Sequence, residues 1–320
     1  MTDRQTGIPH DVLDTLDETY LRWTLKEIPS SPMMPQEILD AIPRKHLDLA
    51  YDTTSERQKI DLYLPPEATG PCSVPLVIFI HGGGFMAGDR RDMQVAVYYG
   101  LLNHGYALAS IGYRVSSEAQ FPDPVKDCKA AVRYLKAHAP EYGIDPSRVA
   151  VVGNSAGAYM ALMLATSPHI TFLEDRSTGN TAFGTEVRCC IATYPPIDFS
   201  LIDGQKAQEG DDSCPMSNPK MPECLFMGAA VDSLPIDDVK AASPTTYLTP
   251  QVPPLMVKAG SKDELVPHMQ SVVFANAAKR IAGNDRVDFE IVPGAGHHDP
   301  AFKRAAFLDE AIAFLDAHMK

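Results

Sequence analysis

Several kinds of segment are missing from this sequence, and each absence excludes a class of protein. Its apolar runs are only as long as a strand or an amphipathic helix, so we expect no transmembrane span. The polar N-terminus lacks the apolar core of a secretory signal, which favours a cytoplasmic protein. The 28 Lys and Arg residues form no basic stripe and are outnumbered by 41 Asp and Glu, for a formal net charge of −13. Nucleic acid is therefore not an expected partner, and a neutral or cationic small molecule is favoured over an anionic one.

Cysteine is scarce, and the six present have the spacing of neither a zinc motif nor a disulfide scaffold. We therefore expect free thiols, as in a reducing compartment. Cys214 and Cys224 share one loop-rich segment, and their pairing in an oxidising setting stays open. The neighbouring residues His297, His298 and Asp299 also make a poor metal site, because adjacent ligands seldom converge and no third group is apparent. We expect no metal and no other cofactor.

From residue 47 onward, strand patterns alternate with helical ones. Two antiparallel strands are expected first, at residues 47–51 and 59–64. Apolar runs then predict the buried strands of a mostly parallel sheet, at residues 76–80, 107–112, 149–152, 188–194, 255–259 and 287–292. This alternation predicts an α/β fold, a doubly wound sheet of about eight strands in one catalytic domain, residues 47–320.

Two segments fall outside this alternation. Residues 1–46 read as a helical leader, because apolar residues recur at helical spacing between Val12 and Trp23. Residues 199–242 form an irregular insertion after the sixth strand, and insertions of this length are usually lids or binding loops. We expect both segments to contribute to a cap over a site. The alternatives are a leader that packs on the body or forms a homodimer contact, and an insertion that is a surface excursion without function.

A glycine-flanked serine links a predicted strand to a predicted helix at residues 153–157, Gly-Asn-Ser-Ala-Gly. Glycines two before and two after a serine are what a nucleophile elbow requires, because strand and helix nearly touch there. The turn would place the Ser155 hydroxyl at a helix N-terminus, where free backbone N–H groups meet developing negative charge. The pentapeptide alone leaves open a plain Gly/Ser turn without chemistry.

A glycine run follows the strand at residues 76–80, with the sequence His-Gly-Gly-Gly-Phe at residues 81–85. Successive glycines leave backbone N–H groups unshielded, so that they can approach an oxyanion. We assign the oxyanion hole to the N–H groups of Gly83, Gly84 and Ala156. A phosphate-binding loop fits less well, because no Lys-Ser/Thr follows and the spacing is not Gly-x-Gly-x-x-Gly.

The last two predicted strands are each followed by a side chain suited to acid–base chemistry. Asp263 and His297 lie where ligands bind in such sheets, beyond the C-terminal ends of the strands. The chain order Ser155, Asp263, His297 is that of the α/β-hydrolase triad, in which a carboxylate orients the imidazole that takes the serine proton. Asp198 is a rival for the carboxylate and His298 for the base. A turn aspartate that caps the next helix is the other interpretation of Asp263.

With these residues in place, the chain resembles the α/β-hydrolase superfamily, in particular its hormone-sensitive-lipase-like and feruloyl-esterase-like (BD-FAE) esterases, over roughly residues 47–318. Residues 112–128 resemble the family's Tyr-Arg…Phe-Pro…Asp-Cys segment, which implies structural roles for Arg114 and Asp127 as a pair. Asn154 and Ala158 depart from the hormone-sensitive-lipase-like Gly-Asp-Ser-Ala-Gly-Gly pattern. The departures favour the feruloyl-esterase-like branch, which includes carbohydrate-ester and small carboxylester hydrolases.

The expected function is a serine hydrolase that cleaves short acyl or aryl esters through an acyl-enzyme on Ser155. An amidase that resembles kynurenine formamidase is the alternative within the superfamily, because that branch also uses a His-Gly-Gly loop. A non-catalytic hydrolase-fold binding protein is the alternative from another class, but such proteins typically lack a triad member. The side chains expected to bind substrate, with His298 at the rim of an acyl pocket, are Phe85, Tyr113, Tyr159, Ile197, Val266 and His298.

Overall fold

The computed structural model describes residues 31–210 and 215–320. Residues 1–30 of the expected leader therefore lie outside the described residues. Its remainder contains the short helix α2 (Gln36–Ala41) and the start of the first strand.

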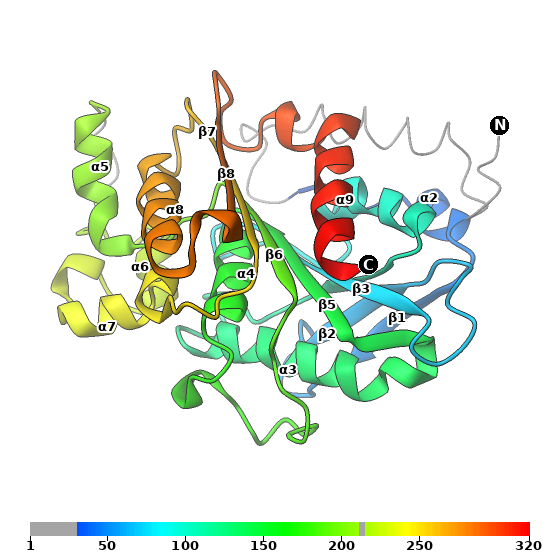
Figure 1. Ribbon diagram of the computed structural model, residues 1–320. Helices are drawn as coiled ribbons and strands as arrows, with labels where there is room; N and C mark the ends of the chain where they lie inside the picture. The colour runs from blue at the N-terminus through cyan, green and yellow to red at the C-terminus, as the bar shows by residue number, and fades with distance from the viewer. Residues whose placement is uncertain (1–30, 211–214) are drawn as a thin grey trace.

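An eight-stranded sheet forms the middle of the molecule (Figure 1). Its strands are β1 (Lys45–Ala50), β2 (Lys59–Tyr63), β3 (Val74–Ile80), β4 (Ala107–Ile111), β5 (Ile144–Asn154), β6 (Cys189–Thr193), β7 (Leu255–Gly260) and β8 (Val287–Val292). Their order is β1-β2-β4-β3-β5-β6-β7-β8. The pairs β1–β2 and β2–β4 are antiparallel, and the other neighbouring pairs are parallel. The predicted sheet, mostly parallel after two leading strands, is confirmed.

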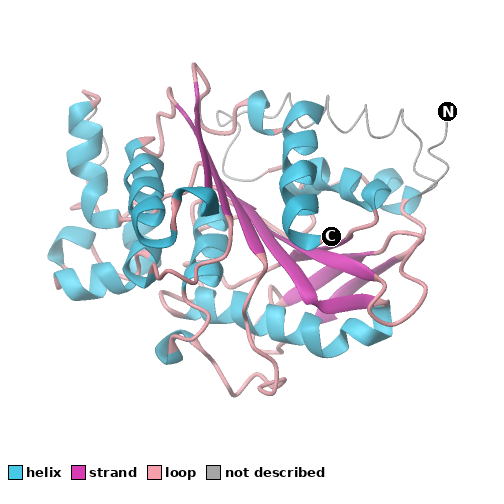
Figure 2. Cartoon of the chain, in the orientation of Figure 1, coloured by secondary structure: helices cyan, strands magenta, loops and turns pink. Residues whose placement is uncertain are grey.

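Helices cover both faces of this sheet (Figure 2). One face carries α3 (Asp123–His138), α4 (Ala156–Thr166) and α8 (Met269–Ala282). The other carries α2, the 3-10 helix η2 (Met93–His104) and α9 (Ala305–Met319). The last helix, α9, begins at Ala305 after a separate 3-10 turn that Asp299 caps. Among the described residues, no helix is both long and apolar enough to cross a membrane.

The central strand β3 shows why its sequence is a continuous apolar run. All seven of its residues are buried. Leu76 and Ile78 pack into the core under α3 and α4, whereas Val77 and Phe79 pack into the core under η2 and α9. Because successive side chains of a strand point to opposite faces, a strand covered on both faces needs apolar residues at every position.

The insertion, residues 199–242, contains α5 (Ile202–Gln208), α6 (Pro222–Met227) and α7 (Ile236–Ala241). These short helices gather beside α8 (Figure 1). The ring of Phe226 in α6 stacks on Phe85 with 4.2 Å between centroids, so aromatic packing joins the insertion to the catalytic domain. Cys224 is a free thiol whose Sγ donates to the Met216 carbonyl at 3.2 Å. Cys214 lies outside the described residues.

Candidate active site

Ser155 stands at a sharp turn between β5 and α4, with φ 52° and ψ −124°. A side chain at Gly157 would place its Cβ 2.0 Å from the Ile80 carbonyl oxygen, and one at Gly153 would lie 2.3 Å from the Gly157 oxygen. Only glycine fits at these two positions, as the sequence pattern predicts. Non-glycine residues adopt this backbone conformation only where the surroundings enforce it, which is typical of functional turns.

The side chains of Ser155, His297 and Asp263 form a continuous hydrogen-bonded chain. Ser155 Oγ lies 2.9 Å from His297 Nε2, and His297 Nδ1 lies 2.7 Å from Asp263 Oδ2. Each of the three residues keeps at most 7% of its surface exposed. The structure thus brings together three residues that span 142 positions of the sequence, each beyond the end of its own strand.

Asp263, and not Asp198, is the carboxylate next to the imidazole. Its second oxygen, Oδ1, accepts hydrogen bonds from the backbone N–H groups of Leu265 at 3.0 Å and Val266 at 2.9 Å. These bonds fix the carboxylate so that Oδ2 faces His297. Asp198 instead caps a 3-10 turn, where it accepts from the backbone N–H of Ser200 at 3.1 Å.

Tyr194, which the sequence analysis missed, packs against both neighbouring histidines. Its ring meets His297 edge-on at 4.6 Å, and its hydroxyl lies 3.2 Å from His298 Nδ1. Burial, reinforced by His297 and Lys303, lowers the pKa of His298 well below its usual range. A neutral imidazole therefore lies behind His297 with 4.8 Å between ring centroids. Tyr194 directly follows β6, but nothing in its sequence context distinguishes it from a core tyrosine.

The glycine run at residues 81–85 lies directly against the serine, since a Cβ on Gly82 would be 3.2 Å from Ser155 Cβ. Gly83 has φ 122°, and a side chain there would place its Cβ 2.3 Å from the Ala87 oxygen. Among the described residues, the backbone N–H groups of Gly83, Gly84 and Ala156 have no hydrogen-bond partner. The three assigned donors are therefore not committed to an acceptor within the described part of the protein.

Two polar residues of η2 and its N-cap hold this loop in place, and neither was anticipated. Gln94 Oε1 accepts from the Gly82 N–H at 2.9 Å, and Asp92 accepts from both the backbone N–H and the side-chain amide of Gln94 at 2.9 Å. Burial raises the pKa of Asp92 to about 7. The side chains of Asp92 and Gln94 thus fix the start of the glycine loop next to Ser155.

His81, the first residue of the loop, is buried against Tyr113. The two rings stack with 4.5 Å between centroids, and the Tyr113 hydroxyl donates to the His81 carbonyl at 2.9 Å. Burial lowers the pKa of His81 to about 4. The imidazole is therefore neutral at physiological pH and acts as part of the core under the loop.

Four of the side chains that were expected to line an acyl pocket are instead fully buried. Phe85, Tyr113, Tyr159 and Ile197 keep at most 1% of their surface exposed. They belong to the core beneath the site, where Phe85 meets Tyr159 edge-on and the Tyr159 hydroxyl donates to the Ala242 carbonyl at 2.6 Å. Val266 retains 8% exposure beside Asp263.

Arg114 and Asp127 form the structural pair that the family resemblance implied. Arg114 Nε lies 2.9 Å from Asp127 Oδ2, and Nη2 lies 2.8 Å from Oδ1. Gln58 also donates to this carboxylate at 2.9 Å. The pair joins the end of β4 to α3 and takes no part in the candidate site.

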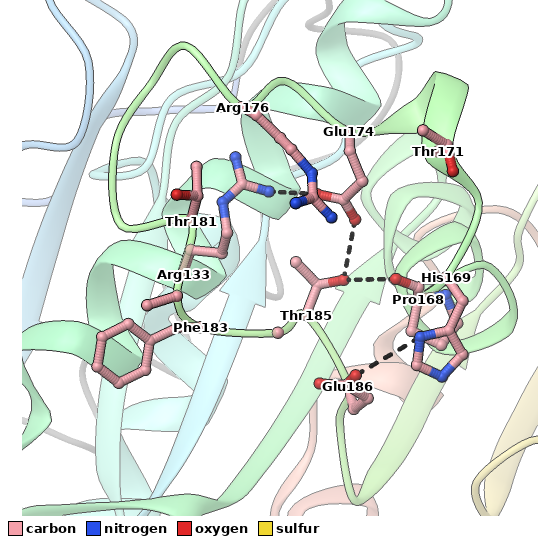
Figure 3. A pocket seen from close by; sticks show the side chains of 12 residues that line it. Arg133, Pro168, His169, Thr171, Glu174, Arg176, Thr181, Phe183, Thr185 and Glu186 are labelled. Carbon is pink, nitrogen blue, oxygen red and sulfur yellow. Dashed lines mark hydrogen bonds and ion pairs between the residues drawn. The ribbon is translucent and has the colours of Figure 1, made fainter.

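A separate polar hollow of about 250 Å³ lies beside the long loop between α4 and β6 (Figure 3). Arg133 lines it and pairs with Glu174, which also pairs with the buried Lys129 at 3.0 Å. These ion pairs hold the loop onto α3. None of the residues that line the hollow belongs to the candidate active site.

Comparison with known proteins identifies the family. A sequence model of the BD-FAE family matches residues 60–278. Esterase LipQ of Mycobacterium tuberculosis is 28% identical over 259 residues, which are 81% of this chain and 58% of that protein. The probable carboxylic ester hydrolase LipM of the same organism is 26% identical over 73% of this chain and 52% of its own length. The chain thus spans little more than half the length of these two curated relatives.

A solved structure, described as a truncated form of a carbohydrate esterase from gut microbiota, has a TM-score of 0.77 at 26% identity. The match covers 86% of this chain and 96% of that one. The sheet order, the serine turn and the match of the family model over more than half of the sequence agree with one another. The chain therefore has the α/β-hydrolase fold and belongs to the BD-FAE family.

Proposed function

We propose that this protein is a serine hydrolase that cleaves small carboxylic esters through an acyl-enzyme on Ser155. The observation that carries the proposal is the hydrogen-bonded chain of Ser155, His297 and Asp263, which ends at a serine that lies against the glycine loop. The two curated relatives, named as an esterase and a probable carboxylic ester hydrolase, support the same reaction class.

The geometry supports a two-step mechanism. His297 Nε2 accepts the Ser155 proton as Oγ attacks the ester carbonyl, and Asp263 stabilises the imidazolium that forms. When the tetrahedral intermediate collapses, His297 returns this proton to the leaving alcohol, and the acyl group stays on Oγ. Water then attacks the acyl-enzyme with His297 again as base. The carboxylic acid leaves, and the Ser155 hydroxyl is restored.

The oxyanion of each tetrahedral intermediate would be bound by the N–H groups of Gly83, Gly84 and Ala156. Ala156 is the first residue of α4, so its N–H also carries the partial positive charge of a helix N-terminus. Loss of a single donor of this kind typically slows catalysis about 100- to 1000-fold. The rigid anchoring of the glycine loop supports this role, because preorganised donors need no rearrangement during the reaction.

We further propose that the insertion at residues 199–242 acts as a cap that narrows the site. The support is its packing on the catalytic domain, through Phe226 on Phe85 and through the bond from the Tyr159 hydroxyl to the Ala242 carbonyl. A cap restricts the site and limits water, which favours small or slim substrates.

Initial rates on p-nitrophenyl acetate, butyrate and octanoate, measured beside N-formylkynurenine, test the proposed reaction. We expect turnover of the short esters that Ser155→Ala abolishes and that the exposed control Ser117→Ala leaves unchanged. Fast deformylation with negligible ester turnover would replace the esterase by an amidase. Ester turnover that survives Ser155→Ala would refute the mechanism.

A further inference from the structure

A buried carboxylate of the insertion lies near the candidate catalytic groups. Glu223, in α6, keeps only 9% of its surface exposed. Among the described residues, the side chain of Glu223 has no hydrogen-bond or ion-pair partner beyond its own backbone N–H. Buried acidic side chains are normally paired, so a carboxylate of this kind inside an enzyme needs an explanation.

The position of α6 is fixed by contacts on either side of Glu223. A side chain at Gly84 would place its Cβ 3.3 Å from the Cβ of Pro222, so the start of α6 rests on the glycine loop. Phe226, three residues after Glu223, stacks on Phe85 of the same loop. Because residues three apart share a helix face, Glu223 is held toward the catalytic domain rather than toward solvent.

Glu223 directly follows Pro222, which packs on Gly84 of the assigned oxyanion hole, so its carboxyl lies in the part of the insertion that borders the candidate site. Burial is the largest influence and raises the pKa of its carboxyl, whereas Lys206 and His297 act in the opposite direction and Asp203 adds to the increase. Lys206, in α5, is itself buried with 6% exposure.

An ionised carboxylate offers about four acceptor sites, and leaving them unpaired in a buried site is unfavourable. A purely apolar ester that fills the space beside Glu223 would remove its remaining access to water and provide no donor. An ester with a hydroxyl or ammonium group at that place would supply the missing hydrogen bond.

We propose that Glu223 determines the substrate specificity of this site by accepting a hydrogen bond from a hydroxyl or ammonium group of the ester. The inference rests on the proposed esterase function. The acceptor is the side-chain carboxylate, and the donor lies on the acyl or the alcohol portion near the scissile bond. A matched ester with a methyl group in the donor's place is the disfavoured substrate.

Three esters of equal size test the acyl portion: ethyl butyrate, ethyl 3-hydroxypropionate and ethyl 3-aminopropionate. They differ only in the group at the end of the acyl chain, which is a methyl, a hydroxyl or an ammonium group. Propyl acetate and 2-hydroxyethyl acetate test the alcohol portion. The measurement is kcat/KM by pH-stat titration for the wild type, Glu223→Gln and Glu223→Met. Glu209→Met, an exposed glutamate of the same insertion, is the control.

In Glu223→Met, we expect the kcat/KM ratio of a donor-bearing ester to its methyl counterpart to fall about 10- to 100-fold, the range for a lost hydrogen bond to a charged group. Glu223→Gln keeps the size and one acceptor. It should therefore lower the ammonium ratio at least about tenfold and the hydroxyl ratio only a few-fold, which distinguishes the two donors. The Glu209→Met control should leave every ratio as in the wild type.

Ratios that stay within twofold of wild type in Glu223→Gln, for both the acyl and the alcohol series, would overturn the inference while leaving the esterase intact. The Gln variant decides this even where Glu223→Met fails to fold, since it is nearly isosteric. A wild-type protein that hydrolyses none of the five esters or the p-nitrophenyl esters would instead refute the proposed function, and the inference with it.

Discussion

Replacement of Asp263 by asparagine should disable the base without disturbing the fold. In the native structure, Oδ1 accepts two backbone N–H bonds, from Leu265 and Val266, and Oδ2 faces His297 Nδ1. In Asp263→Asn, the amide oxygen is the group that can still accept from the two N–H donors. The amide nitrogen must then face His297. The imidazole would accept at Nδ1 and carry its proton on Nε2, where it cannot take the proton of Ser155.

The size of the expected loss of kcat follows from the free energy needed to reverse the orientation of the new amide group. The reversed orientation restores the active tautomer but faces the NH₂ group toward the N–H donors of Leu265, which is part-buried, and Val266, which is buried. Each unsatisfied donor costs about 1–3 kcal/mol, so the active orientation is disfavoured by about 2–6 kcal/mol. This reduces its population to a few per cent or less. We therefore expect kcat to fall by at least about 30-fold, up to the roughly 10⁴-fold loss seen for the same change in serine protease triads.

The assay is steady-state hydrolysis of p-nitrophenyl butyrate, with thermal unfolding as a check on folding. KM and the melting temperature of Asp263→Asn should remain close to the wild-type values. Asp198→Asn is the matched control, because Asp198 only caps a 3-10 turn, and its kcat should stay within a few-fold of wild type. A loss of kcat in Asp198→Asn with near-normal activity in Asp263→Asn would show that the tautomer argument is wrong.

Two further changes probe the support of the glycine loop. Gln94→Met removes the acceptor of the Gly82 N–H. It should lower the free energy of unfolding by about 1–3 kcal/mol and reduce kcat more than it raises KM. An unchanged kcat would argue against preorganisation of the loop by Gln94. Burial lowers the pKa of His81 to about 4 in the folded state, against 6.5 in the unfolded chain. Because the unfolded chain then binds the proton more readily, the folded state loses stability as pH falls below 6.5, by about 2 kcal/mol at pH 5. Urea denaturation at pH 7 and pH 5 should show this loss diminished in His81→Asn, whereas equal losses in both proteins would contradict a buried neutral imidazole.

The features predicted correctly from sequence are those encoded locally. The turn at Ser155 needs glycines at fixed offsets, and the glycine run after β3 exposes its own backbone, so each motif carries its geometry within a few residues. The candidate acid and base could be placed because each directly follows a strand, and the ends of parallel strands converge at one edge of the sheet. Local encoding also made the strands of the sheet predictable.

The features that were missed or misplaced depend on contacts between distant segments. Tyr113 and Tyr159 adjoin the motifs in sequence, but their side chains turn into the core, and a motif does not specify that direction. Gln94 supports the loop only because η2 packs beneath it. Glu223 lies in an insertion without strand or helix periodicity, so only the packing of α6 on the loop reveals its position.

Labelling with a fluorophosphonate tests the central claim most directly, since this reagent reacts with an activated serine hydroxyl. Intact-protein mass spectrometry should show a single adduct on the wild type, and peptide mapping should place it on Ser155. The Ser155→Ala variant should remain unlabelled, whereas the Ser117→Ala control should be labelled at the wild-type rate. An unlabelled wild-type protein, or an adduct on another residue that persists in Ser155→Ala, would contradict the assignment of Ser155 as the nucleophile.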